Sequence, residues 1–128
     1  MRLGPERRVR KRPEFLDLTA RGVRVATAHF VLLAAKQASD PRPSRLGITA
    51  SRRVGNAVVR NRLKRLAREA FRALAGVLPV GHDLLVICRQ PGDLSAQQVI
   101  QEWDRALPRL LKLIERGEPS HSGGRSRA

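Results

Sequence analysis

The segment Ala57–Ala75 constrains the fold more than any other part of the sequence, because its apolar residues recur at helical spacing. At roughly 100° per residue, one face is apolar and consists of Val59, Leu63, Leu66, Ala70 and Leu74. Asn56 is a suitable N-cap, and Gly76 and Pro79 end the pattern. A helix with one apolar face buries it against another layer, which the rest of the chain has to supply.

Short apolar runs elsewhere in the chain predict that this layer is a sheet. Four strands are expected, at Val23–Ala26, His29–Lys36, Arg45–Ser51 and His82–Arg89. In the third, Leu46, Ile48 and Ala50 alternate with small or polar residues, which is the period of a half-buried strand. The fourth is a continuous apolar run, typical of a strand that is buried on both faces.

Two further helices complete the predicted order. One covers Arg7–Ala20, and the last begins at Leu94–Ser95 and continues to about Glu115. Pro108 lies inside the last helix and predicts a kink or a break. The order indicates an α+β fold with helices packed on one small sheet. The strand–helix–strand unit around Ala57–Ala75 also allows a parallel pair of strands joined by a crossover helix.

The length of 128 residues fits one compact domain, which we assign to residues 7–116. Residues 1–6 are expected to be flexible, and the Ser-, Gly- and Arg-rich residues 117–128 to be disordered. No segment reaches the ~18 apolar residues of a membrane span, and the N-terminus lacks a secretory signal. The single Cys88 excludes an intrachain disulfide. We therefore expect a cytoplasmic protein.

The charge balance is strongly one-sided, with 26 Lys and Arg against 11 Asp and Glu and a formal net charge of +15. An excess of this size destabilises the folded chain unless a polyanion neutralises it. Nucleic acid, an anionic membrane surface and an acidic protein are the candidates, and a folded basic domain favours nucleic acid. Most of the cations are arginine, which can donate two hydrogen bonds to a phosphate and can stack on bases.

The positions of the cations in Ala57–Ala75 are more informative than their number. Four recur every fourth residue beside the apolar face, namely Arg60, Lys64, Arg68 and Arg72, and Asn61 and Arg65 lie next to them. Like charges at this spacing destabilise a helix by roughly 0.2–0.5 kcal/mol per pair. On a merely solvated face the signs would usually alternate, and here they do not. We therefore interpret the row as a surface for a phosphate backbone.

Two other basic groups are candidates for the same ligand. One is the block Arg7–Arg12, and the other is a weaker patch in which Arg52 and Arg53 pair with Arg45. An N-terminal block of this kind can equally be a solvated arm, so this alternative stays open. The groups can act on one ligand only if the fold brings them together.

Aromatic residues are few, and their expected roles differ. Phe30, Phe71 and Trp103 lie in apolar runs and are predicted to be core residues. Phe15 follows the basic block, so both base stacking and core packing remain open for it.

The sequence predicts no catalytic residue and no metal site. His29, His82 and His121 are far apart, and Cys88 has no second thiol for a zinc site. The nucleophile and phosphate-loop motifs of common enzymes are absent. If the chain belongs to an enzyme, another component has to supply the active site, and the chain alone is expected to hold no cofactor.

From Gly55 to Arg72 the sequence GNAVVRNRLKRLAREAFR strongly resembles the Arg-Asn-Arg signature region of bacterial ribonuclease P protein subunits. The resemblance continues on both sides of this string and covers about residues 7–115. It includes RVRKR with the following Phe15, then the strings FVL, RLGI and HDLLVICR. A run of this length and order is much more specific than a lone Arg-Asn-Arg.

The resemblance implies both a fold and a division of labour. The fold is an α-β-β-β-α-β-α two-layer sandwich with a small mixed sheet and a left-handed crossover, like a domain of a ribosomal protein. The chain would assist a catalytic RNA, in a 1:1 assembly that uses Mg²⁺, to remove the 5′ leader of precursor tRNA. The implied contacts to the catalytic RNA are Arg53, Arg60, Asn61, Arg62, Lys64, Arg65 and Arg68. A cleft between the first helix and the sheet would hold the leader, with Arg8, Lys11, Phe15 and Phe30.

This sequence departs from the family pattern in that cleft. Thr19 stands where the family often has a second Phe, and Leu33 where many members have a Tyr. We therefore expect a weaker or altered preference for the leader sequence. The alternatives are a ribosomal or other structural RNA-binding protein of the same fold, then a DNA-binding module. A helix on a membrane surface is the least favoured.

Overall fold

The computed structural model describes residues 12–37, 44–77 and 81–116. The helices are α1 (Arg12–Arg21), α2 (Ala57–Leu74) and α3 (Ala96–Arg116), with short 3₁₀ turns η2 (Arg52–Val54) and η3 (Ala75–Val77). The strands are β1 (Val23–Ala26), β2 (Phe30–Lys36), β3 (Leu46–Ala50) and β4 (His82–Cys88). The predicted α-β-β-β-α-β-α order is therefore confirmed. The predicted segments 1–6 and 117–128, and the first residues of the predicted N-terminal helix, lie outside the described residues.

The four described strands form one mixed sheet in the order β1-β2-β4-β3. β1 and β2 are antiparallel, and so are β2 and β4. β3 and β4 are parallel, with Leu46 opposite Leu84 and Ala50 opposite Cys88. The chain between these two strands forms α2, so the expected crossover helix is present, while its left-handedness stays a prediction. β4 is a central strand, and side chains on both of its faces are buried, which explains its continuous apolar sequence.

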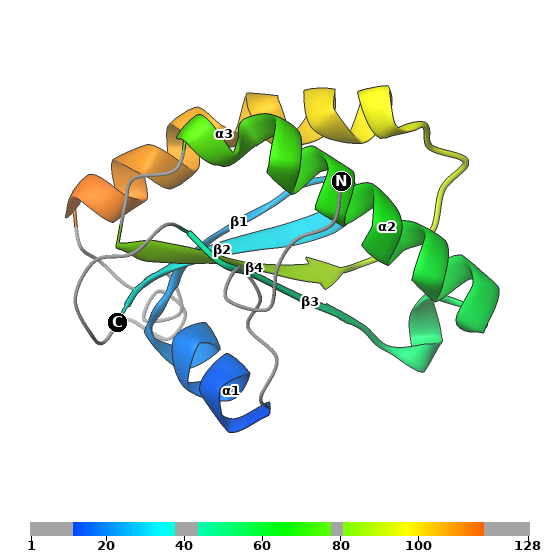
Figure 1. The fold of residues 1–128 in the computed structure, drawn as a ribbon, viewed down its shortest axis with the longest axis horizontal. Coiled ribbons are helices and arrows are strands. Elements are labelled where there is room, and N and C mark those ends of the chain that lie inside the picture. Colours follow the sequence, from blue (N-terminus) through cyan, green and yellow to red (C-terminus); the bar gives the residue numbers. More distant parts are fainter. Residues whose placement is uncertain (1–11, 38–43, 78–80, 117–128) are drawn as a thin grey trace.

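Helices lie on both faces of the sheet, with α2 and α3 on one face and α1 on the other (Figure 1). The larger core lies under α2 and α3, where Phe30 and Trp103 pack edge to face with ring centroids 5.6 Å apart. The smaller core joins Leu18 of α1 to Leu33 and Leu85. Because α1 has only 10 residues, or about 15 Å, it covers part of its face and leaves the rest accessible.

The helix ends follow the capping rules that the sequence suggested. The backbone N–H of Val59 donates to Oδ1 of Asn56 at 3.0 Å, which confirms Asn56 as the N-cap of α2. At the start of α3, Ser95 and Gln98 exchange side-chain and backbone hydrogen bonds in a capping box.

Pro108 does not break α3, which is continuous from Ala96 to Arg116, so of the expected kink or break the break is excluded and the kink stays a prediction. Proline removes one backbone donor, and the carbonyl that loses its partner belongs to Asp104. Asp104 and Pro108 are both exposed, so water can satisfy that carbonyl. No helix among the described residues is long and apolar enough to cross a membrane.

Candidate nucleic-acid interface

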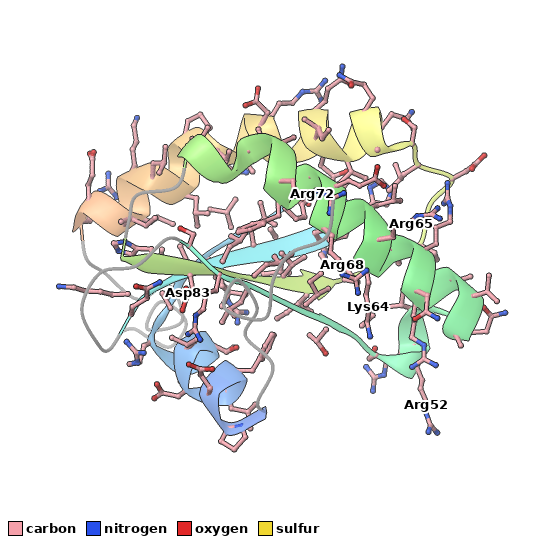
Figure 2. All side chains as sticks on the ribbon, viewed as in Figure 1. Arg52, Lys64, Arg65, Arg68, Arg72 and Asp83 are labelled. Carbon is pink, nitrogen blue, oxygen red and sulfur yellow. The ribbon has the colours of Figure 1, made fainter. Side chains whose placement is uncertain are left out.

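One side of α2 packs into the core and the side next to it is basic. The core side consists of Leu63, Leu66, Ala67, Ala70 and Phe71, with Val59 and Leu74 packed at its edges. Figure 2 shows Lys64, Arg65, Arg68 and Arg72 along the outward side of the helix. We call Arg60, Lys64, Arg68 and Arg72, with the neighbouring Asn61 and Arg65, the α2 basic row. The predicted separation of an apolar face from a basic face is confirmed.

The α2 basic row lacks intramolecular counter-charge. Within the described parts of the chain, no carboxylate oxygen lies within 4.0 Å of a charged nitrogen of this row. Glu69 is the only acid in α2, and the first turn of the helix contains none. The N-terminus of a helix carries partial positive charge of its own, so the row and the helix end together attract anions.

The η2 turn extends this surface beyond the start of α2. Arg52 and Arg53 are both exposed there, and Arg52 projects from the turn in Figure 2. The next turn depends on Gly55, whose φ of 155° disfavours other residues. A Cβ on Gly55 would lie 2.9 Å from Cβ of Val59. Gly55 therefore allows the turn to pack against the first turn of α2.

Arg62 is the exception among the predicted RNA contacts on α2. Its guanidinium donates to the carbonyls of Leu94 at 2.6 Å and Gly92 at 3.3 Å, and lies 3.9 Å from Asp93. These residues form the loop between β4 and α3, so Arg62 fixes this loop against α2. Its side chain projects away from the α2 basic row.

Arg45 does not join Arg52 and Arg53 in a basic patch, so that prediction is wrong. The three residues flank opposite ends of β3. The side chain of Arg45 lies 2.7 Å from the fully buried carboxylate of Asp83 and 2.8 Å from Glu14 of α1. The hydrogen bond with Asp83 raises the pKa of Arg45 despite its burial, and Glu14 adds to the effect. Figure 2 shows Asp83 close to α1 and far from Arg52.

The accessible part of the α1 face is less polar than the α2 basic row. Phe15, Val31 and Ile87 are half-buried, and each packs against the smaller core. The hydroxyl of Thr19 donates to the carbonyl of Phe15 at 2.7 Å. Leu33 is 0% exposed beneath α1. Phe15 is therefore the described aromatic residue that an extended strand could reach on this face.

Phe30 does not lie on that face. Its side chain is 0% exposed and belongs to the core under α2 and α3. The prediction that Phe30 contacts the leader is contradicted by this position, whereas its prediction as a core residue is confirmed. Arg8 and Lys11 lie outside the described residues.

A second basic row, on α3, was not predicted from the sequence. It consists of four cations spaced by four, three and four residues, which places them on one side of a helix: Arg105, Arg109, Lys112 and Arg116. All four are exposed. The spacing is visible in the sequence, but Pro108 in its middle predicted a kink or a break, which would divide the row. We call these four residues the α3 basic row.

The described residues offer little chemistry of their own. Among them, no three His, Cys, Asp or Glu side chains gather as a metal site. The thiol of Cys88 is buried, and burial raises its pKa to about 11 although the charge of Lys64 opposes the shift. The thiol is therefore protonated near neutral pH and is a poor nucleophile.

The fold and α2 together define a small α+β domain with an uncompensated basic side among its described residues. Residues 3–111 match the protein-family model described as Ribonuclease P. The chain is 44% identical over 109 residues to the ribonuclease P protein component of Shouchella clausii, covering 84% of this chain and 88% of the relative. It is 37% identical over 118 residues to that of Brevibacillus brevis, covering 92% of each chain. The chain therefore belongs to the family of bacterial ribonuclease P protein components.

Solved structures agree with this family. The ribonuclease P protein of Staphylococcus aureus matches with a TM-score of 0.69 and 32% identity, covering 80% of this chain and 93% of that one. The protein from Thermotoga maritima matches with a TM-score of 0.68 and 36% identity, covering 80% and 96%. The chain is thus a subunit of the ribonucleoprotein that matures the 5′ ends of tRNA, which implies association with the ribonuclease P RNA.

Proposed function

We propose that the α2 basic row and Arg53 bind the catalytic RNA, and that the α1 face holds the 5′ leader of precursor tRNA. The proposal that α2 binds the catalytic RNA rests on the absence of counter-charge along this helix in the described structure. Phosphates would supply the missing negative charge and release the counterions that the row otherwise collects. By lowering the repulsion between two polyanionic RNAs, the chain would tighten their complex.

The leader would lie on the α1 face beside Phe15, with Arg8 and Lys11 contributing from outside the described residues. Stacking on an aromatic ring stabilises a bound base by roughly 1–3 kcal/mol. Phe15 offers one such ring, while Thr19 and the buried Leu33 offer none. We therefore propose a leader site that holds the backbone and few bases, with a weak preference for leader sequence.

The catalytic groups and Mg²⁺ would belong to the RNA. The described part of the chain has no group of three side chains that fits a metal ion. Its own contribution is to bind and position the two RNAs. We further propose a 1:1 assembly in the cytoplasm and little affinity for duplex DNA at matched salt concentration.

The test is cleavage of precursor tRNA by the ribonuclease P RNA of the same organism at low Mg²⁺ concentration. Added chain should raise the cleavage rate, and the chain alone should cleave nothing. Lys64→Gln with Arg68→Gln should raise the chain concentration needed for half-maximal stimulation. Lys36→Gln, which removes an exposed charge at the end of β2 and outside the α2 basic row, should leave that concentration unchanged.

The same assay separates the leader site from the α2 basic row. Phe15→Leu keeps an apolar side chain against the smaller core but removes the ring. It should raise KM for a substrate with a leader and not for one with a single leader nucleotide. RNA binding without any stimulation of cleavage would contradict the proposed role. An equal change in KM for both substrates would exclude Phe15 from the leader site.

A further inference from the structure

A groove runs between α3 and the β1 side of the sheet. The larger of its two hollows, of about 630 Å³, lies over the β1–β2 turn at Ala26, Thr27 and Ala28. The smaller, of about 430 Å³, continues along β1 toward the end of α3 at Arg116. Ala26 and Arg109 line both hollows, so the two adjoin. We call the pair the β1–α3 groove.

The lining of this groove is strongly basic. The α3 basic row supplies four cations, and β1 and the end of β4 add two more, Arg24 and Arg89. No carboxylate oxygen lies within 4.0 Å of the charged nitrogens of these six residues, among the described parts of the chain. The amides of Gln98 and Gln101 add neutral hydrogen-bond donors.

The one carboxylate in the groove, Glu102, is already engaged. It accepts hydrogen bonds from the hydroxyl of Thr27 and from the backbone N–H of His29, at 2.9 Å for the latter. Its other oxygen lies 2.8 Å from Nδ1 of His29. Glu102 therefore stabilises the β1–β2 turn and does not pair with the arginines. Arg89 donates one hydrogen bond to the carbonyl of Thr27 and so holds the same turn, while the α3 basic row and Arg24 are left to a ligand.

α2 and α3 form one layer on the sheet. The β1–α3 groove lies at one edge of this layer, and the α2 basic row lies at the other edge. α3 borders β1 at one edge of the sheet, whereas β3 forms the other edge next to α2. Three strand spacings separate the edge strands, or about 14 Å. The hydrogen bonds of Arg62 show which side of α2 faces the β4–α3 loop. The α2 basic row lies on a different side of the helix and points away from α3.

We propose that the β1–α3 groove binds the phosphate backbone of a second RNA segment, so that the chain bridges two segments. The inference rests on the proposed function of the α2 basic row and extends it. The α3 basic row extends over the 12 residues from Arg105 to Arg116, which correspond to a rise of about 16 Å. This length accommodates several phosphates, because each strand of a duplex carries one phosphate per ~3.4 Å of helix axis. The guanidinium groups would contact phosphates, and Ala26 and Leu94 would contact sugars.

The first test compares the salt dependence of RNA binding for single-charge variants. Arg109→Gln removes the cation shared by both hollows, Lys64→Gln removes one from the α2 basic row, and Lys36→Gln is the control. Each variant is titrated against the ribonuclease P RNA and, separately, against precursor tRNA. The slope of log K against log salt should fall by about 0.7–0.9 per lost phosphate contact. Arg109→Gln should show this fall for at least one RNA, and Lys36→Gln for neither.

The outcomes separate the two proposals. If Lys64→Gln lowers the slope and Arg109→Gln does not, the groove does not bind RNA and the proposed function stands. If neither variant lowers a slope, both proposals fail. If Arg109→Gln instead changes binding of an acidic protein and of no RNA, the groove serves another partner and the inference is overturned.

A second test locates the RNA on each surface. Arg109→Cys and Arg65→Cys each introduce an exposed thiol for a photo-crosslinker, while the native Cys88 is buried and stays protonated. In the complex with both RNAs, the two positions should crosslink to different RNA segments. Crosslinks from both to the same few nucleotides, or none from position 109, would overturn bridging.

Discussion

Arg45 and Arg68 are the same residue type in the same basic protein, yet their surroundings are opposite. Arg45 lies between the carboxylates of Asp83 and Glu14, which join α1 to the sheet. Arg68 points outward from α2 and has no carboxylate within 4.0 Å among the described residues. The first is neutralised by the fold, and the second is left for an external anion. Whether an arginine of this protein stabilises the fold or is free to bind an anion therefore depends on whether a carboxylate lies beside it.

The difference also explains how a chain with a net charge of +15 can fold. Three of its buried or half-buried acids, Asp83, Glu14 and Glu102, form ion pairs at places that hold elements together. The basic rows on α2 and α3 receive none of them. Stability and RNA binding therefore depend on different residues, and substitutions should separate the two.

Asp83→Asn should have the largest effect on stability. The carboxylate is fully buried and accepts hydrogen bonds from Arg45 and from the side chain of Gln37. Without this carboxylate, Arg45 has Glu14 as its remaining acidic partner among the described residues, which should lower the free energy of unfolding by about 3 kcal/mol. Unfolding in denaturant measures this free energy. Asp17→Asn, in an exposed pair with Arg21, is the control and should cost less than about 0.5 kcal/mol.

Under conditions where Asp83→Asn is folded, its salt slope for the ribonuclease P RNA should equal that of the wild type. A reduced slope would mean that Arg45 or α1 contributes to that surface, and the contrast with Arg68 would be lost.

Arg62→Ala and Arg68→Ala should separate stability from RNA binding on a single helix. Arg62→Ala removes the donors to Gly92 and Leu94, which should lower the free energy of unfolding by about 1 kcal/mol. Its RNA salt slope should hardly change. Arg68→Ala should leave stability nearly unchanged and lower the slope by about 0.7–0.9. A lower salt slope for Arg62→Ala, at unchanged stability, would show that Arg62 binds RNA despite its contacts with the loop.

The sequence predicted the elements well because their signals are local. The apolar stripe of α2, its N-cap Asn56 and the central strand β4 all follow from periodicity and capping. Successive side chains of β2 point to opposite faces of the sheet, but its continuous apolar sequence does not say which face α1 covers. The family resemblance implied that Phe30 contacts the leader, whereas the packing of the helices places it in the opposite core.

The pairing of charges was not predictable in the same way. Arg45 and Asp83 are 38 residues apart and meet only because β3 and β4 are neighbours in the sheet. Helical periodicity separates Arg62 from the α2 basic row, but the loop that it contacts comes from a distant part of the chain. The β1–α3 groove likewise needs Arg24 and Arg89 to be brought beside α3 by the fold.

Of these substitutions, Glu102→Gln should have the smallest effect, and its effect on the free energy of unfolding should depend on pH. Burial alone would raise the pKa of Glu102, but the hydrogen bonds from Thr27 and His29 outweigh it and lower the pKa below its ordinary value. A carboxylate with a lowered pKa in the folded state stabilises it at pH values above the ordinary pKa. That contribution is lost as the pH falls through the folded-state pKa.

Wild type and Glu102→Gln should therefore differ most near neutral pH, by about 1 kcal/mol in the free energy of unfolding. The difference should shrink as the pH falls below about 4.5, where the wild-type carboxylate takes up its proton. Unfolding across this pH range measures it. A difference that stays constant with pH would mean that Glu102 acts through packing alone. Stronger RNA binding by Glu102→Gln, at unchanged stability, would instead show that Glu102 opposes phosphates in the β1–α3 groove and is not withdrawn from it.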